Sequence, residues 1–223
     1  MKQQILLLTL CTFFYGCTST EPAKPAAAPE TAPVARRPAD TRPVIATFGD
    51  SLTAGAGVED NENYPYYLQK LLDAQGYKYR VANHGLSGDT TSGGVDRVGQ
   101  VLADKPEIVV LELGGNDGLR GLPVKSSVEN MERMVTQLSA GGAKIVLAGI
   151  TLPRNYGADY ISDFEAMYKN LAAKHKLPMI PFLLEGVAMV PGMMQQDGIH
   201  ATAVGNQKVA DTVLAKLKPL LKK

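Results

Sequence analysis

The chain has 223 residues, of which 45% are hydrophobic and 20% charged, a composition that suits one compact domain rather than two catalytic lobes. Lys and Arg number 23 against 22 Asp and Glu, so the formal net charge is +1 and the positive surplus of a nucleic-acid-binding protein is missing. The two cysteines, Cys11 and Cys17, both lie near the start, so the rest of the chain can form neither a disulfide nor a thiolate metal site.

Residues 1–17 have the pattern of an export signal. Lys2 supplies a positive charge, and an apolar run extends from Ile5 to Tyr15. Such a run is too short to span the roughly 30 Å hydrocarbon core of a bilayer, so we interpret it as a processed signal peptide. Gly16-Cys17 resembles the lipobox of bacterial lipoproteins, which implies that Cys17 is lipidated and becomes the first mature residue. An ordinary secretory peptide with an incidental cysteine is the alternative.

Residues 18–43 are rich in Pro, Ala and Thr and carry almost no large apolar side chains. Such a segment cannot bury enough surface to offset the entropy lost on ordering, so we expect a disordered tether. A tether after a lipidation site would hold a folded domain, residues 44–223, away from the membrane surface. We therefore expect an exported bacterial protein, periplasmic or anchored at Cys17, with that lipid as its only membrane attachment.

From residue 44 onward, short apolar runs rich in β-branched residues alternate with longer segments of helical period. The predicted strands are Val44–Phe48, Tyr79–Ala82, Ile108–Leu113, Ile145–Ile150 and Met179–Phe182. The predicted helices are Tyr64–Ala74, Gly94–Ala103, Val124–Ala140, Ser162–Lys174 and Ala203–Leu221. Near-continuous apolar strands separated by helices indicate a parallel sheet covered on both faces, and hence a three-layer α/β domain. Ligands bind beyond the carboxyl ends of the strands in such sheets, so chemistry is expected in the loops that follow them.

The first predicted strand leads into Gly49-Asp50-Ser51-Leu52. Gly49 permits a tight turn, and a serine between a strand and a helix has its hydroxyl at the mouth of the sheet, beside the helix's partial positive charge. Ser51 can therefore be a nucleophile. The alternative is that Ser51 or Asp50 only caps the next helix, which is the usual role of these residue types at such junctions.

The segment Asn83–Thr90, after the second strand, is dense in small residues whose backbone N–H groups can stabilise a developing negative charge. His84 within it can be structural or functional. Neither G-x-G-x-x-G nor G-x-x-x-x-G-K-[ST] occurs, which argues against a nucleotide site. After the third strand, the Asn116 amide can donate to an oxyanion or close an Asx-type turn, and Asp117 is expected to cap a turn or helix.

Asp197-Gly198-Ile199-His200 precedes the last predicted helix. A serine nucleophile needs an adjacent base held in the correct tautomer by a third group, and an Asp and a His three residues apart in a turn can both face one serine. A metal pair or a surface histidine is the alternative. Metal binding is disfavoured because the other histidines, His84 and His175, are distant in sequence and no H-E-x-x-H occurs.

With these motifs at the strand mouths of one sheet, the chain resembles the SGNH or GDSL family of serine hydrolases. It is most similar to the branch of bacterial arylesterases, lysophospholipases and acyl-CoA thioesterases I. The resemblance implies a flavodoxin-like sandwich with a five-stranded parallel sheet. The matching stretches are Gly49–Leu52 (GDSL), Gly85–Gly94 (GLSGDTTSGG), Leu111–Gly121 (LELGGNDGLRG), Leu152–Gly157 (LPRNYG) and Gln196–His200 (QDGIH).

The resemblance also implies the roles of individual residues. Ser51 would be the nucleophile, Asp197 the orienting acid and His200 the base. The N–H groups of Ser51 and Gly88 and the side chain of Asn116 would form the oxyanion hole. The implied reaction is hydrolysis of a small-molecule acyl ester or thioester through an acyl-enzyme, without cofactor or metal. The alternatives are a carbohydrate O-acetylesterase that uses the same residues and a non-catalytic surface lipoprotein.

We expect the acyl pocket in two segments, Leu152–Tyr160 and Leu183–Met194, because the first follows the fourth strand and the second precedes Asp197. The flexible side chains of Met189, Met193 and Met194 either accommodate a variable acyl chain or fill the core.

Overall fold

The computed structural model describes residues 40–223. The expected signal peptide (1–17), the expected lipidation site at Cys17 and all but the end of the expected tether (18–43) lie outside the described residues. At the end of that tether, Arg42 donates from Nη1 to the carbonyl oxygen of Tyr79 at 3.2 Å.

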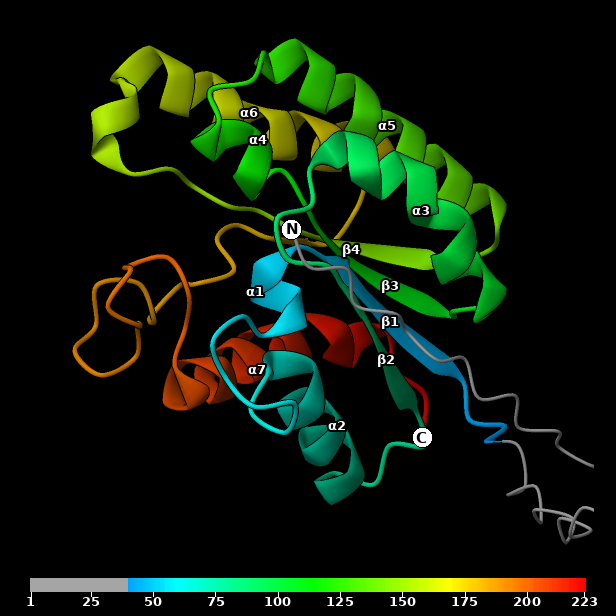
Figure 1. The fold of residues 1–223 in the computed structure, drawn as a ribbon. Helices are drawn as coiled ribbons and strands as arrows, with labels where there is room; N and C mark the ends of the chain where they lie inside the picture. The colour runs from blue at the N-terminus through cyan, green and yellow to red at the C-terminus, as the bar shows by residue number, and fades with distance from the viewer. Residues whose placement is uncertain (1–39) are drawn as a thin grey trace, which may run out of the picture. The chain divides into compact units, whose positions relative to one another are not determined.

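Five parallel strands form one sheet in the order β2-β1-β3-β4-β5 (Figure 1). They are β1 (Val44–Gly49), β2 (Arg80–Gly85), β3 (Ile108–Glu112), β4 (Lys144–Ala148) and β5 (Met179–Ile180). The predicted five-stranded parallel sheet is therefore confirmed. β5 is shorter than the run that predicted it because Pro181, which has no N–H for the ladder, follows it. The chain moves from β1 outward to β2 and then returns to β3 on the other side of β1, so the strand order reverses between β1 and β3. Open α/β sheets bind their ligands at such a reversal.

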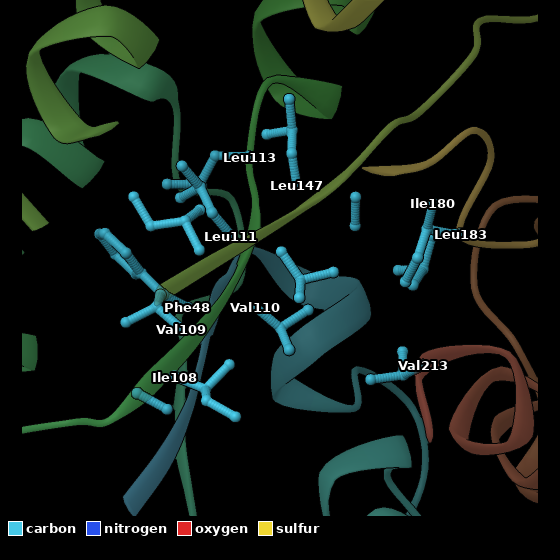
Figure 2. Packing of buried hydrophobic residues seen from close by; sticks show 14 of the residues in the cluster. Phe48, Ile108, Val109, Val110, Leu111, Leu113, Leu147, Ile180, Leu183 and Val213 are labelled. Carbon is cyan, nitrogen blue, oxygen red and sulfur yellow. The ribbon is translucent and has the colours of Figure 1, made fainter. Parts of the chain in front are cut away.

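Helices cover both faces of the sheet, as Figure 1 shows. On one face lie α3 (Thr91–Ala103), α5 (Val124–Ala140) and α6 (Ala158–His175), and on the other lie α2 (Tyr64–Ala74) and α7 (Ala203–Leu217). β1 and β3 are buried along their whole lengths because both sheet faces are covered. In Figure 2, Val109 and Leu111 of β3 lie on the opposite side of the sheet from Val110, which lies toward Val213 of α7. The three-layer α/β fold is confirmed.

The structure differs from the predicted elements mainly at helix ends. α3 begins at Thr91 rather than Gly94, because the Thr90 hydroxyl caps it by accepting the N–H of Gly93. α6 begins a turn earlier than predicted, and α7 ends at Leu217, where a 3₁₀ turn (Lys218–Leu220) containing a proline follows. Two short helices were missed, α1 (Ser51–Ala54) and α4 (Gly115–Leu119). Neither is long enough to display a helical period.

None of the helices between residues 40 and 223 has the length and hydropathy needed to cross a membrane.

Candidate active site

The motifs from the ends of β1, β2 and β3 meet at the carboxyl edge of the sheet, around the reversal in strand order. Ser51 opens α1 directly after β1, and Asn116 lies in α4 directly after β3. The capping role at α1 belongs to Asp50, whose Oδ1 accepts the Leu52 N–H at 3.0 Å. The hydroxyl of Ser51 is thus left available for a different partner.

Gly49 is required for space. Its φ is not positive. A Cβ atom built on it would collide with the side chains of Thr53 and Glu112. The glycine therefore lets two buried polar side chains approach the end of β1.

Ser51, His200 and Asp197 form one hydrogen-bonded chain. The Nε2 of His200 lies 2.9 Å from the Ser51 hydroxyl oxygen, and its Nδ1 lies 2.6 Å from Oδ2 of Asp197. A carboxylate that accepts the Nδ1 proton leaves Nε2 as an acceptor, which is the tautomer a general base needs. The structure therefore brings together the three residues that the sequence motifs selected.

Asp197 is held as an anion by its own turn. Its Oδ1 accepts the backbone N–H groups of Ile199 at 2.9 Å and His200 at 3.0 Å. The side-chain hydrogen bond from His200, reinforced by that residue's backbone N–H, lowers the pKa of Asp197 to about 2. Asp197 is therefore ionised throughout the neutral range and can stabilise an imidazolium.

Gln195 ties the Asp197–His200 turn to the segment that follows Ser51. Its backbone N–H donates to the carbonyl oxygen of His200 at 2.8 Å. Its side-chain amide donates to the carbonyl oxygens of Ala56 at 2.8 Å and Ala201 at 2.9 Å. The sequence analysis missed this residue, because no local pattern indicates a contact between positions 139 apart.

Two of the expected oxyanion donors are free to bind a ligand. Among the described residues, the backbone N–H groups of Ser51 and Gly88 have no hydrogen-bond acceptor. Gly88 has φ +80°, a conformation that favours glycine, and its carbonyl oxygen accepts from Arg120 at 2.9 Å.

The third expected donor, Asn116, is already engaged. Its Nδ2 donates to Oδ2 of Asp50 at 3.1 Å and to the carbonyl oxygen of Asp89 at 2.8 Å, which uses both amide hydrogens. Its side chain therefore joins the loops after β1, β2 and β3. To bind an oxyanion, it must share or release one of these two hydrogen bonds.

Arg97 of α3, which the sequence analysis did not select, also binds the loops after β1 and β2. It donates to the carboxylate of Asp89 at 2.6 Å and to the carbonyl oxygens of His84 and Gly49, each at 2.7 Å. Its guanidinium carbon also lies 4.6 Å from the centre of the Phe48 ring. One nearly buried cation thus links the ends of β1 and β2 to the loop that carries Gly88.

Other polar residues near the motifs have structural contacts. Asp117 is buried and accepts from the backbone and hydroxyl of Thr91 and from the hydroxyl of Ser127, which agrees with the capping role expected of it. His84 lies within β2 rather than in a loop, and its Nε2 is 2.9 Å from Asp104. Across residues 40–223, no three His, Cys, Asp or Glu side chains are grouped so that they could hold a metal ion.

A cleft of about 930 Å³ opens beside Ser51 and His200. Met189 and Met194 line it, whereas Met193 packs against the core. Both segments expected to form the acyl pocket contribute to the cleft, together with side chains that the sequence analysis did not select. Its apolar lining comprises Leu52, Ala56, Leu119, Ile150, Leu152, Pro153, Ile161, Phe182, Leu184, Ala188, Met189, Met194 and Ile199. An apolar wall of this extent suits a hydrocarbon chain.

The amino-acid sequence is similar to a known protein family and to several characterised proteins. The model of the GDSL-like lipase/acylhydrolase family matches residues 47–208. The chain is 46% identical over 178 residues to esterase TesA of Pseudomonas aeruginosa, covering 79% of this chain and 89% of that protein. It is 36% identical over 175 residues to thioesterase 1/protease 1/lysophospholipase L1 of Escherichia coli K12, covering 78% and 83%.

Solved structures show the same fold. A crystal structure of TesA aligns with a TM-score of 0.77 at 45% identity, covering 80% of this chain and 99% of that one. The psychrotrophic esterase EstA from Pseudoalteromonas, in a structure inhibited by monoethylphosphonate, aligns with a TM-score of 0.76 at 29% identity, covering 79% and 97%.

Proposed function

Because the chain belongs to the GDSL-like lipase/acylhydrolase family, we propose that Ser51 is the nucleophile with which it cleaves carboxylic ester or thioester bonds. Its membership of the family and its SGNH fold agree with the sequence motifs, and the protein is a carboxylic ester hydrolase. The observation that carries the proposal is the hydrogen-bonded chain from Ser51 through His200 to Asp197.

The proposed reaction has two halves. His200 removes the hydroxyl proton as Ser51 attacks the carbonyl carbon, and it then gives this proton to the leaving alcohol or thiol as the tetrahedral intermediate collapses. A water molecule then attacks the acyl-enzyme with His200 again as base, which releases the carboxylic acid and restores Ser51. Asp197 keeps the imidazole oriented and stabilises its charged form.

The oxyanion is proposed to lie against the N–H groups of Ser51 and Gly88, which have no other acceptor within residues 40–223. Asn116 supplies the third donor by sharing between Asp89 and the oxyanion the N–H that it gives to Asp89. Its other N–H stays on Asp50 and keeps the amide plane fixed. Donors placed in advance stabilise the charge that develops in the transition state without reorganising during the reaction.

The apolar cleft favours substrates with a medium or long acyl chain over acetylated sugars. Ala188 and Met194 lie on its wall, and Met189 is 97% exposed at its edge. Esters and thioesters of fatty acids have the chemistry that such a lining recognises. The relative from Escherichia coli is named a thioesterase and a lysophospholipase.

The proposal for cellular location rests on the sequence. Residues 1–17 serve as the export signal, Cys17 carries the lipid, and residues 18–43 tether the catalytic domain to a bacterial membrane. Incorporation of a labelled fatty acid into the wild-type protein, and its loss in Cys17→Ser, is the expected result. Release of an unlipidated wild-type protein would support the ordinary secretory alternative.

A panel of p-nitrophenyl esters from acetate to decanoate, with an acyl-CoA, a lysophospholipid and acetylated sugars, tests the substrate class. We expect kcat/KM to rise with chain length and Ser51→Ala to be inactive on every substrate. Ala188→Phe, which fills the cleft, should reduce activity on decanoate more than on acetate, whereas Val204→Phe, at an exposed position outside the lining, should not. Activity confined to acetylated sugars would instead favour the O-acetylesterase alternative.

A further inference from the structure

Two buried carboxyl groups lie beneath the Ser51 turn, and none of the steps above uses the deeper one. Glu112 ends β3 and is completely buried, and Asp50, which precedes Ser51, is 2% exposed. Their side chains are within hydrogen-bonding reach of each other. Two carboxyl groups that share a site away from water cannot both be ionised, so the pair holds a proton at neutral pH.

The donors around the pair indicate which carboxyl group holds that proton. Oε2 of Glu112 accepts the backbone N–H of Asp50 at 3.2 Å and the hydroxyl of Thr53 at 2.8 Å. Oε1 of Glu112 is buried and has no partner in the described part of the chain. A proton on Oε1 displaces no donor, whereas Oε2 already accepts two.

Asp50 has the opposite pattern, since both of its oxygens already accept. Oδ1 takes the Leu52 N–H at 3.0 Å, and Oδ2 takes the side-chain amide of Asn116 at 3.1 Å. A proton on either oxygen of Asp50 would compete with one of these donors. The arrangement is therefore satisfied with Glu112 neutral and Asp50 ionised.

We propose that Glu112 is a positioning residue that acts as a neutral carboxylic acid. Its Oε1–H donates to the carboxylate of Asp50, which in turn fixes the amide of Asn116 for the oxyanion. This inference rests on the proposed function, in which Asn116 is an oxyanion donor. Glu112 itself does not touch the substrate and acts only through Asp50.

Burial raises the pKa of both carboxyl groups, and the charge of Asp50 raises that of Glu112 further. The other titratable groups around the pair are Tyr64, Tyr168, Asp89 and His200. Burial raises the pKa of both tyrosines, so they stay neutral. The negative charge of Asp89 is balanced by the positive charge of Arg97 in their ion pair. His200 is the cation that favours the charged form of Asp50 once it accepts the serine proton.

Loss of the Glu112 proton would place a second negative charge beside Asp50, close to where the oxyanion develops. The two carboxylates would repel each other, and Asp50 would lose the hydrogen bond from Glu112. The consequence for catalysis is a fall in kcat at alkaline pH, with little change in KM because the acyl cleft is untouched.

The discriminating variants are Glu112→Gln and Glu112→Leu. The glutamine amide can accept from Asp50 and Thr53 through its oxygen and donate to Asp50 through its nitrogen, so it reproduces a neutral acid. We expect Glu112→Gln to keep kcat within roughly threefold of the wild type and to lack the alkaline fall, because it has no proton to lose. Glu112→Leu removes the hydrogen bond from Glu112 to Asp50. It should lower kcat by about 10²-fold at unchanged KM, as removal of an oxyanion donor does.

Infrared spectroscopy tests the protonation itself without any turnover. We expect Ser51→Ala protein carrying ¹³C-labelled glutamate to show a protonated carboxylic acid band at about pH 7, well above the ordinary pKa of glutamate. The band should be absent from the Ser51→Ala/Glu112→Gln double variant. A wild-type protein without esterase activity would defeat the proposed function and still leave this band to report on Glu112.

Either of two results would overturn the inference. One is the absence of a protonated glutamate band at that pH. The other is a Glu112→Gln variant that folds but is as impaired as Glu112→Leu at every pH. If Glu112→Leu does not fold, the comparison of the wild type with Glu112→Gln and the infrared band still decide the question.

Discussion

The imidazole Nε2 of His200 lies 2.9 Å from the hydroxyl oxygen of Ser51, although 149 positions separate the two residues in the chain. The contact depends on a turn in which Asp197 accepts both the imidazole Nδ1–H and the backbone N–H of His200. The pairing of Ser51 with His200 is therefore fixed by a few hydrogen bonds in one short turn, and these can be removed singly.

Asp197→Asn tests the orienting carboxylate. The substitution keeps the shape of the side chain but removes its charge and favours the wrong imidazole tautomer, so we expect kcat to fall by about 10³ to 10⁴. KM for a p-nitrophenyl ester should change little. Asp211→Asn, at an exposed position of α7, is the control and should leave the kinetics unchanged. Retention of more than a tenth of wild-type kcat by Asp197→Asn would argue against an orienting role.

Gln195→Ala tests the hydrogen bonds that join the His200 turn to the segment after Ser51. Loss of two amide hydrogen bonds should lower the free energy of unfolding by about 1 to 3 kcal/mol and reduce kcat by impairing the alignment of His200 with Ser51. Gln196→Ala is a matched control because its side chain is exposed and makes no hydrogen bond within residues 40–223. Urea denaturation and steady-state kinetics measure both effects. Equal behaviour of the two variants would show that Gln195 does not hold the turn.

The sequence predicted the elements of this fold better than the contacts between them. The apolar runs of β1 and β3 and the helical period of α5 are local patterns, so they were readable without tertiary information. Ser51, Asn116, Asp197 and His200 were found because each lies in a recognisable motif at the end of a strand or before a helix.

The partners of those residues were not predicted, because their contacts join distant positions. Gln195 reaches Ala56, and Glu112 reaches Asp50, across gaps of 139 and 62 positions. Glu112 ends an otherwise apolar strand, and nothing in its local sequence distinguishes a protonated acid from a surface carboxylate. Arg97 looked like an ordinary helix residue until the fold placed it against Asp89.

Arg97→Lys tests the cation that supports the loop carrying Gly88. Arg97 and Asp89 are nearly buried, and a lysine cannot make the three differently directed hydrogen bonds of the guanidinium. We expect the free energy of unfolding to fall by about 1 to 3 kcal/mol, because buried acceptors are left without a donor although the charge is kept. Arg42→Lys, at a more exposed ion pair, should cost less than about 1 kcal/mol. Equal losses in the two variants would contradict the structural role of Arg97.

The buried pair of carboxyl groups also predicts how stability depends on pH. The folded-state pKa values of Asp50 and Glu112 are raised above those of the unfolded chain, so the folded protein binds more protons above about pH 4. The stabilisation is complete below the unfolded pKa values and is lost as pH rises through the folded ones. Wild-type protein should therefore lose stability relative to Glu112→Gln as pH increases from about 4 to 8. A stability difference that does not change with pH, measured by urea denaturation, would contradict this prediction.

Covalent labelling with a fluorophosphonate probe, followed by mass spectrometry of the modified peptide, tests the central claim most directly. The probe reacts rapidly with a serine only when a base and an oxyanion hole activate it. We predict a single adduct on Ser51 in the wild-type protein and no adduct in Ser51→Ala, with slower labelling of His200→Ala. A folded wild-type protein that takes up no probe, or that carries it on a different residue, would contradict the assignment of Ser51 as nucleophile.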